Sequence, residues 1–442
     1  MGVLIWNELK RRIRQVKTWV LILVLILISI LVIKNYKANE YKVYYTMGDA
    51  FQSLAGYQVD DIEKLNNKNT YKIVKYSYDL LDKAGKQADQ AIQNNDMKEY
   101  NRATTFGYLL LAKEGAERDG RLREISFRNK TKGMWEQVSN GVDYDKVSFE
   151  PVSFYHNRGM YFEFLLDAQF YYNLYQKGLQ DSNEYQMDSM TFCYHYYNKI
   201  IPMFIAFLVL ILMFDSINQE HSNGSIKLLL TQPLSRMKYL ITKIIVGILH
   251  TLFVTILGSI PIVIAYGIGD HFKNFNYPVV YLKNSFSSLS SIHNYVEYDL
   301  IKRGENIIIG YNYLSFYPKG VNGGISNQLT VMPLYQFLGL SLLLLSVCIL
   351  FFVSLNVLIS SLLKNKIVAF LSSALITIVG MVLSNPLITS DSYNYSPFSM
   401  TNPIRILGGT YNVAALPAIL IYLGASFILI TINILYFRKK NL

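Results

Sequence analysis

The side chains that could perform acid–base, nucleophilic or metal chemistry are scattered along this sequence and form no known motif. The histidines and cysteines stand singly, and no HExxH, CxxC or GxSxG pattern occurs. They are His156, His195, His221, His250, His271, His293, Cys193 and Cys348. A catalytic site gathers titratable groups, and a metal site gathers ligands at short spacings. We therefore expect no metal site, and a protein that is not itself an enzyme.

The sequence also lacks the glycine-rich loop that binds nucleoside triphosphates. No GxxxxGK[ST] pattern occurs, including around Gly85 and Lys86, where a glycine precedes a lysine. Without that loop the backbone offers no phosphate cradle of this type. We expect the chain to bind no ATP in that way, and no cofactor directly.

Six long apolar stretches are the elements that would have to position any functional residue. A helix needs about 20 mostly apolar residues to cross the hydrocarbon core of a bilayer, so the shorter stretches also need flanking residues. The predicted spans are 18–34, 200–214, 240–266, 334–363, 367–386 and 413–437. The predicted fold class is therefore an α-helical integral membrane protein with six transmembrane helices.

The basic residues lie mainly beside one set of span ends. The whole net charge of +11 is accounted for by residues 1–17, 215–243, 364–366 and 438–440. An excess of lysine and arginine marks cytoplasmic segments, so both termini are expected in the cytoplasm. The extracellular segments would then be 35–199, 267–333 and 387–412. Because membrane topology explains the charge, we do not expect nucleic-acid binding.

The long segment between the first two spans is predicted to be a large, mainly helical extracellular domain. Apolar residues recur every three or four positions between residues 72 and 93, as on one face of a helix. Asp96 followed by Glu99 forms a capping-box pattern, which predicts the start of a second helix that continues through Leu111. Short strands are an alternative for residues 146–155.

Aromatic side chains become dense between residues 158 and 199, just before the second span. Tyrosine combines an apolar ring with a polar tip, which suits contact with an amphipathic molecule that leaves a bilayer. We therefore consider Tyr194, Tyr197 and the intramembrane His250 as candidate residues of a substrate path. Two ordinary roles compete with this interpretation, namely filling the core of the extracellular domain and forming the aromatic belt of a membrane interface.

Residues 215–239 form the best-defined cytoplasmic segment, which joins the second and third spans. An Asn-Gly pair ending at Gly224 indicates a turn, and Ser225 can cap a helix. An apolar stretch at 226–231 follows, and Pro233 ends it. A short apolar helix is costly in water without a partner surface. We therefore expect a cytosolic partner to cover this segment.

This segment resembles the permease subunits of type 2 ATP-binding-cassette (ABC) exporters. The resemblance rests on a glutamate, a Gly-Ser-Ile turn, a leucine run and a Gln-Pro-Leu-Ser-Arg motif in the family's order and spacing. It implies that the ATPase-coupling residues are Glu220, Gly224, Ser225, Leu229, Pro233, Arg236 and Lys243. An amphipathic interface helix at residues 1–17, followed by six spans, also fits the family. The long insert after the first span departs from its simple members.

The resemblance implies a transporter in which this chain provides the path and a partner provides the energy. Two copies of a cytosolic ABC ATPase subunit would hydrolyse ATP with Mg, and a second permease subunit would complete the path. An amphipathic peptide, lipid-like or drug-like molecule would move outward across a plasma membrane, in a bacterium, through this multi-pass protein. The alternatives are a non-transporting sensor or immunity receptor that captures an extracellular peptide, and a membrane enzyme.

Overall fold

The computed structural model describes most of the chain. The described residues are 2–38, 47–49, 51, 68–150, 160–180, 187–222, 235–287, 289, 328–384, 395–408 and 413–439. Helices predominate among them, in agreement with the sequence. Four of the predicted coupling residues lie outside the described residues, namely Gly224, Ser225, Leu229 and Pro233.

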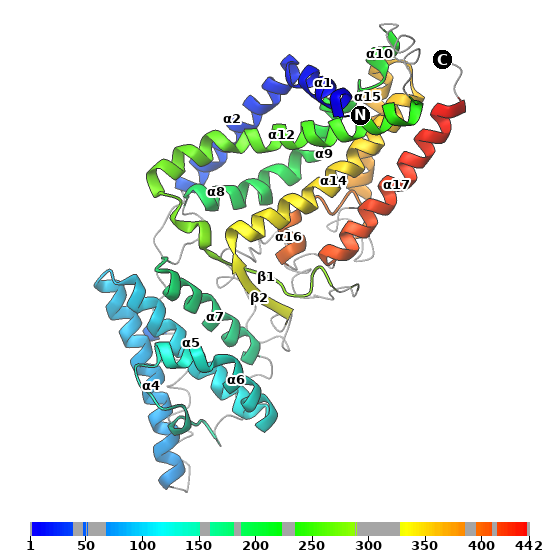
Figure 1. Cartoon of the computed structure of the whole chain (residues 1–442). Helices are drawn as coiled ribbons and strands as arrows, with labels where there is room; N and C mark the ends of the chain where they lie inside the picture. The colour runs from blue at the N-terminus through cyan, green and yellow to red at the C-terminus, as the bar shows by residue number, and fades with distance from the viewer. Residues whose placement is uncertain are drawn as a thin grey trace.

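Within the described ranges, six helical segments are long and apolar enough to cross a membrane (Figure 1). They are α2 (Val16–Ala38), a second span (Ser189–Glu220), α12 (Arg236–Asp270), α14 (Leu334–Leu362), α15 (Lys366–Leu383) and α17 (Ala415–Lys439). Each contains or overlaps one of the six stretches expected from the sequence. The helical membrane fold predicted from the apolar pattern is thus the fold that the structure has.

The second span and α14 form the centre of this membrane bundle. In the most apolar 18-residue stretch of α14, 72% of the residues are buried, whereas 17% are buried in the corresponding stretch of α15. Exposed apolar side chains are most numerous on α2 and α15, and α12 and α17 also carry several. In a bilayer such side chains can face lipid, because hydrocarbon surrounds the outer helices.

The second span contains one wider helical turn. The span consists of α8 (Ser189–His195), a π-helical turn η3 (Tyr196–Ile200) and α9 (Ile201–Met213), and it ends within α10 (Asn218–Ser222). Pro202 has no N–H to donate to the carbonyl of Asn198, four residues earlier. Asn402 supplies a donor instead, since its Nδ2 lies 2.8 Å from that carbonyl oxygen. The irregular turn is therefore stabilised from outside the helix.

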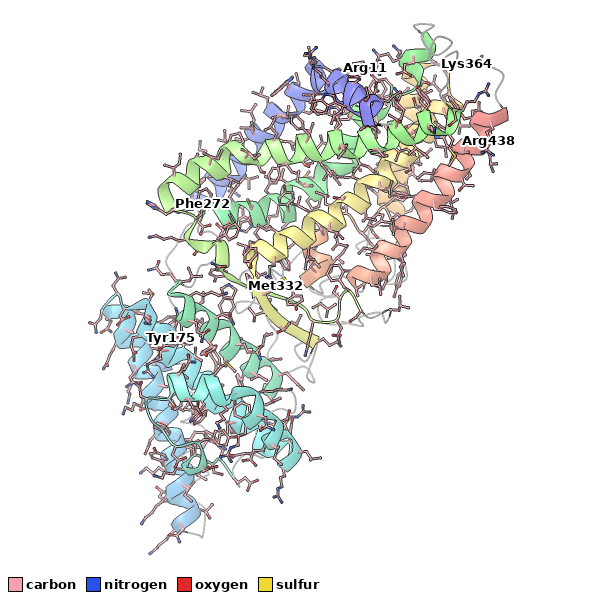
Figure 2. The ribbon with its side chains drawn as sticks, in the orientation of Figure 1. Arg11, Tyr175, Phe272, Met332, Lys364 and Arg438 are labelled. Atoms are coloured by element: carbon pink, nitrogen blue, oxygen red, sulfur yellow. The ribbon has the colours of Figure 1, made fainter. Side chains whose placement is uncertain are left out.

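The two ends of the membrane bundle differ in charge. Figure 2 shows Arg11, Lys364 and Arg438 at one end, and Phe272 and Met332 toward the other. We term these the basic end and the insert end, because the insert between α2 and α8 extends from the second of them (Figure 1). The helix α1 (Gly2–Ile13) and the last turn of α17 both lie at the basic end.

Four helices form most of the described part of the insert. They are α4 (Lys68–Gln93), α5 (Met97–Arg118), α6 (Arg121–Val138) and α7 (Met160–Lys177). The helix α5 packs against the other three, and the residues from Tyr100 to Glu117 are buried on every face of it. The predicted strand alternative is not found at residues 146–150, and residues 151–155 lie outside the described part.

Asp96 caps α5, as its sequence position predicts. Its side chain accepts a hydrogen bond from the Glu99 N–H at 3.0 Å. The reciprocal bond of a capping box does not form, because the Glu99 carboxylate pairs with Arg102 at 2.6 Å. The Asp96 N–H donates to the Ala91 carbonyl at 2.8 Å instead. The cap is therefore half of the predicted motif, and it still fixes where α5 begins.

The helix α5 carries charged side chains into the core of the insert. Lys113 and Glu117 form an ion pair of 2.6 Å, and their side chains are 2% and 3% exposed. Glu117 also accepts a hydrogen bond from the Phe149 N–H at 2.7 Å. The Lys113 ammonium lies 4.1 Å from the centre of the Tyr144 ring. These contacts join α5 to residues 144–149, which follow α6.

Glu114 makes the stability of the insert depend on pH. Its carboxylate accepts a hydrogen bond from the Tyr78 hydroxyl at 3.0 Å. Burial raises the pKa of Glu114 from 4.5 to about 7, although the Tyr78 hydrogen bond and the Arg118 charge oppose this rise. The folded insert therefore holds the proton more firmly than the unfolded chain does. The bound proton therefore stabilises the fold by about 3 kcal/mol for such a rise in pKa. This stabilisation is complete below the unfolded pKa and is lost as the pH rises through the folded pKa.

We expect Glu114→Gln to weaken the pH dependence of unfolding. Between about pH 5 and about pH 8, the melting temperature of the insert should fall less in the variant than in the parent protein. Trp135 fluorescence can follow this transition, because Trp6 and Trp19, the only other tryptophans, precede the insert. Equal falls in the two proteins would contradict the assignment of this pH dependence to Glu114.

A two-stranded antiparallel sheet links the insert to the membrane helices. The strand β1 (Pro278–Leu282) follows α12 through the turn η4 (Lys273–Asn276), and its partner β2 (Leu329–Pro333) runs directly into α14. The helix α7 packs on both strands, and the ring centres of Phe170 and Tyr277 are 5.8 Å apart. The segment after the third span therefore packs on the insert.

The residues just after β1 also hold the start of α17. The Ser285 Oγ accepts a hydrogen bond from the Ala415 N–H at 2.8 Å, and the Ser285 carbonyl accepts one from the Leu416 N–H at 2.8 Å. These donors belong to the first turn of α17, where backbone N–H groups have no partner within the helix. Residues next to β1 thus fix the start of the sixth span.

Candidate functional site

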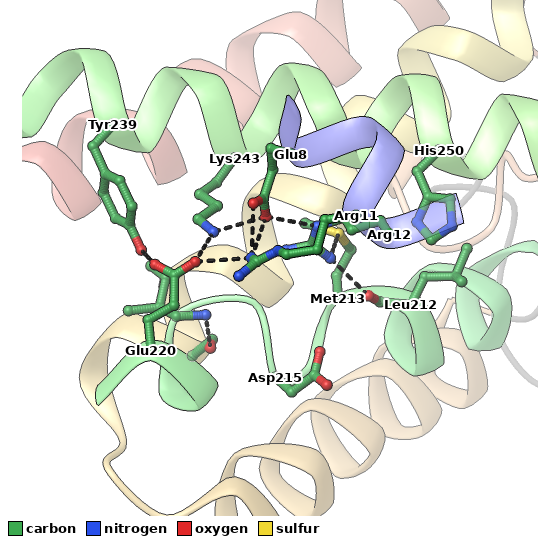
Figure 3. A network of polar contacts seen from close by, with 12 residues as sticks. Glu8, Arg11, Arg12, Leu212, Met213, Asp215, Glu220, Tyr239, Lys243 and His250 are labelled. Carbon is green, nitrogen blue, oxygen red and sulfur yellow. Dashed lines mark hydrogen bonds and ion pairs between the residues drawn. The ribbon is translucent and has the colours of Figure 1, made fainter. Parts of the chain in front are cut away.

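The helix α1 lies at the basic end against α12 (Figure 3). Glu8 precedes Arg11 by three residues and Arg12 by four, so the three side chains share one face of α1. This face meets the end of the second span and the first turns of α12. An amphipathic helix at the boundary of the membrane bundle is what the sequence of residues 1–17 predicts.

The centre of the site is an ion pair between Glu220 and Lys243. Glu220 belongs to α10, at the end of the second span, and Lys243 lies two turns into α12; their side chains are 4% and 3% exposed. The Tyr239 hydroxyl, one turn before Lys243, donates a hydrogen bond to the other carboxylate oxygen of Glu220. The pair therefore joins the two helices that flank residues 223–234 (Figure 3).

Glu8 and Arg11 of α1 complete this network. The Lys243 ammonium lies 2.8 Å from the Glu8 carboxylate. The Arg11 guanidinium lies 2.9 Å from Glu220 and 2.7 Å from Glu8. The Nε of Arg12 lies 3.1 Å from Glu8. Each of the two carboxylates is thus shared by at least two bases, and the network connects three helices.

The surrounding bases keep Glu8 ionised. Burial by itself would raise the pKa of the Glu8 carboxyl, but the charges of Lys243, Arg12 and Arg11 outweigh burial and lower this pKa to about 2. Removing one member of a buried ion network leaves its partner uncompensated, which costs about 3–5 kcal/mol. The network therefore holds α1, the second span and α12 together.

Arg12 and Lys17 bind the carbonyl end of α9. The last carbonyls of a helix have no partner within the helix, and positive charge is favourable beside them. The Leu212 carbonyl accepts hydrogen bonds from Arg12 Nη1 at 3.1 Å and from Lys17 Nζ at 3.4 Å. Lys17 also pairs with Asp215 at 2.8 Å. The junction between α1 and α2 is thus attached to the end of the second span.

His250 ties α12 to the same junction. Its Nε2 lies 3.0 Å from the Thr18 Oγ1. The Thr18 hydroxyl donates its only proton to the Arg12 carbonyl at 2.8 Å, so its oxygen accepts the bond from the histidine. The imidazole therefore carries a proton on Nε2. His250 is fully buried, and this contact places it in the packing of the basic end.

Arg236 connects the start of α12 to the end of α17. Its Nη1 donates to the carbonyls of Phe437 at 3.1 Å and Arg438 at 3.3 Å. Tyr239 stacks on Phe437, with ring centres 5.9 Å apart. All three predicted coupling residues within the described ranges, Glu220, Arg236 and Lys243, thus hold helices together at the basic end. Their role in coupling stays a prediction.

The candidate substrate-path residues do not gather in one place. Tyr194 is fully buried and stacks on Phe337 of α14, with ring centres 6.1 Å apart. Tyr197 packs edge to face on Tyr196 at 5.2 Å. Both lie in helix packing toward the insert end, whereas His250 lies at the basic end. A substrate path along these three residues stays a prediction.

The two ends of the insert meet beside the second span. Tyr36, in the last turns of α2, packs on the His195 ring of α8 with ring centres 4.6 Å apart. The Lys199 ammonium lies 4.8 Å from the centre of the Tyr36 ring. The chain therefore leaves the membrane bundle and returns to it at neighbouring points.

Sequence reasoning missed the contribution of α1 to the site. Glu8 is the only acidic residue among the first 17, and it precedes two arginines at helical spacing. An acid inside a basic interface helix is a signal for an internal ion pair, because it weakens attraction to an anionic surface. Tyr239 gave no signal, since a tyrosine at the start of a span also fits an interfacial belt.

The fold and the site together define a multi-pass α-helical membrane protein. In the part of the chain that the structure describes, no group of three or more His, Cys, Asp or Glu side chains is arranged to hold a metal ion. Cys193 and Cys348 are both buried free thiols.

A family model described as ABC-2 family transporter protein matches residues 3–407, and the chain belongs to this family. It is therefore a permease of an ABC transporter, and the resemblance found in the segment after the second span is confirmed. Permeases of this family work with an ABC ATPase. No curated protein and no solved structure matches this chain.

Proposed function

We propose that this permease exports an amphipathic molecule and is driven by a separate cytosolic ABC ATPase that docks at the basic end. The buried network of Glu8, Arg11, Glu220 and Lys243 carries the proposal. It joins α1, the second span and α12 directly beside residues 223–234, the segment expected to contact the ATPase. A displacement of residues 223–234 would therefore be transmitted to α1, the second span and α12 at the same time.

In this proposal the predicted coupling residues act in two ways. Gly224, Ser225, Leu229 and Pro233 form the surface that the ATPase contacts, and ATP and Mg are held by the ATPase alone. Glu220, Arg236 and Lys243 act as positioning residues, because two of them are buried and the third binds the end of α17. Closure of the ATPase on ATP then biases the helices between two arrangements.

Further parts of the transporter follow from the same proposal. Two ATPase copies act with a second permease subunit, which would cover part of the apolar surface exposed on α2, α15 and α17. The charge of the basic end supports its cytoplasmic location in a plasma membrane. The spans carry few charges, which favours an amphipathic or apolar substrate over a small ion.

Purification with the energy-supplying partner tests the proposal. We expect the tagged chain, extracted from its native membrane, to retain an ABC ATPase identifiable by mass spectrometry. The complex should hydrolyse ATP several-fold faster than the isolated ATPase, and Arg236→Glu should remove this stimulation. A chain that binds an external peptide without any ATPase would support a sensor instead. A bond change catalysed by the chain alone would support an enzyme.

A further inference from the structure

We propose that the turn after α12 and the start of α14 insert aromatic side chains into the lipid headgroup region at the insert end of the bundle. The side chains are Phe272, Phe275 and Tyr335, which we term the aromatic ledge. Their exposed fractions are 42%, 43% and 40%. Aromatic side chains with this exposure are unfavourable in water and favourable at the boundary between headgroups and acyl chains.

The length of α12 places the ledge at that boundary. Lys243 marks the basic end through its ion pairs with Glu8 and Glu220. Asp270, the last residue of α12, follows 27 residues later, which corresponds to about 40 Å of helix at 1.5 Å per residue. A bilayer with its polar interfaces is about 40–45 Å thick. With the ion network at one interface, the residues after Asp270 therefore lie at the other.

A lipid-facing stripe of α12 leads directly to the ledge. It consists of exposed isoleucines at four-residue spacing, namely Ile256, Ile260, Ile264 and Ile268. Residues at this spacing lie one above the other on a helix. Phe272 continues the spacing one step beyond the end of the helix. The exposed apolar side chains of α12 thus lead along one side of the helix toward the aromatic ledge.

The backbone after α12 turns the Phe272 ring back toward the membrane. His271 and Phe272 both adopt left-handed conformations, with φ of 56° and 52°. The Phe272 N–H donates to the Asp270 carboxylate at 2.7 Å, which holds this turn. The ring lies against Gly267, where an added Cβ would come within 2.1 Å of it. The ring therefore covers the last turns of α12 instead of pointing away from the bilayer.

The other two aromatic rings and the nearby bases fit a lipid headgroup region. Phe275 stacks on Tyr335 at 5.0 Å between ring centres, so the start of α14 supports the turn. Lys273 is exposed within the turn, and Lys37 at the end of α2 lies 5.4 Å from the ring of Tyr266 on α12. Lysines beside an aromatic belt can reach lipid phosphates while their stems stay in apolar surroundings.

Spin labels on single cysteines test the proposal. Phe272→Cys, Phe275→Cys and Leu122→Cys would each be labelled with a nitroxide in the full-length protein, in nanodiscs of phosphatidylcholine and phosphatidylglycerol. Leu122 is the control, because it is 86% exposed on α6 of the insert. The unsubstituted protein sets the background, since both native cysteines are buried. The measurement compares collisions with molecular oxygen, which enters the bilayer, and with a water-soluble nickel chelate.

We expect labels at residues 272 and 275 to show a ratio of oxygen to nickel collisions several-fold higher than the label at residue 122. Ratios at residues 272 and 275 that match the ratio at residue 122 would overturn the proposal, because the ledge would then face water. Low collision rates with both agents at residues 272 and 275 would also overturn it, since another protein surface would then cover the ledge. If Phe272→Cys does not fold, Phe275→Cys alone decides between these outcomes.

Discussion

Lys243→Met should uncouple this permease from its ATPase and also destabilise it. The substitution keeps much of the side-chain volume but removes the charge that pairs with Glu8 and Glu220. The two carboxylates would then share Arg11 and Arg12 in a buried setting, at a cost of about 3–5 kcal/mol. We expect the stimulation of ATP hydrolysis by the permease to be lost, as measured on the purified complex in nanodiscs, together with a lower melting temperature.

Lys238→Met is the matched control for this prediction. Lys238 lies on the same helix, five residues earlier, and its side chain is exposed. A double variant, Glu220→Gln with Lys243→Met, separates stability from coupling. It should recover part of the lost stability, because removing both partners leaves no lone charge, but it should remain uncoupled. Wild-type stimulation in Lys243→Met would refute a coupling role for the network.

Glu117→Ala should unfold the insert at a much lower temperature. The substitution leaves the Lys113 ammonium buried without its closest carboxylate and removes the acceptor of the Phe149 N–H. Breaking a buried pair from one side costs about 3–5 kcal/mol, which lowers the melting temperature of a domain of this size by on the order of 10 °C. Trp135 fluorescence during heating of the full-length protein measures this change.

Glu150→Ala provides the comparison for Glu117→Ala. Glu150 is an exposed glutamate one residue after Phe149, so its removal changes the same charge in the same region without opening the core. Its melting temperature should stay close to that of the parent protein, because surface substitutions usually change stability by less than about 0.5 kcal/mol. Similar melting curves for both variants would show that the α5 ion pair contributes little.

The parts of the fold that depend on local pattern were predictable from the sequence. The six spans follow from apolar length alone, and Asp96 indicated the start of α5 because capping depends on a few neighbouring residues. Glu220, Arg236 and Lys243 were singled out by a motif, and the structure describes all three at one end of the bundle. The motif did not indicate what they contact.

Features that depend on distant segments were not predictable. The apolar period of α5 indicates one buried face, but three neighbouring helices bury every face of it from Tyr100 to Glu117, including Lys113. The π-helical turn depends on Pro202 together with Asn402, which lies 200 residues later. The bond between Arg11 and Glu220 likewise spans 209 positions. No local period or spacing reports such pairs, since they exist only after the helices have packed.

The contact between Tyr36 and His195 bears on how such a permease can acquire an additional domain. Both ends of the insert are held next to each other by rings that belong to the membrane helices themselves. The distance that any intervening polypeptide must bridge is therefore short and fixed, whatever its length. Residues between these two points can therefore be gained or lost during evolution without moving the surrounding spans. The insert is in this sense a module that is independent of the membrane helices.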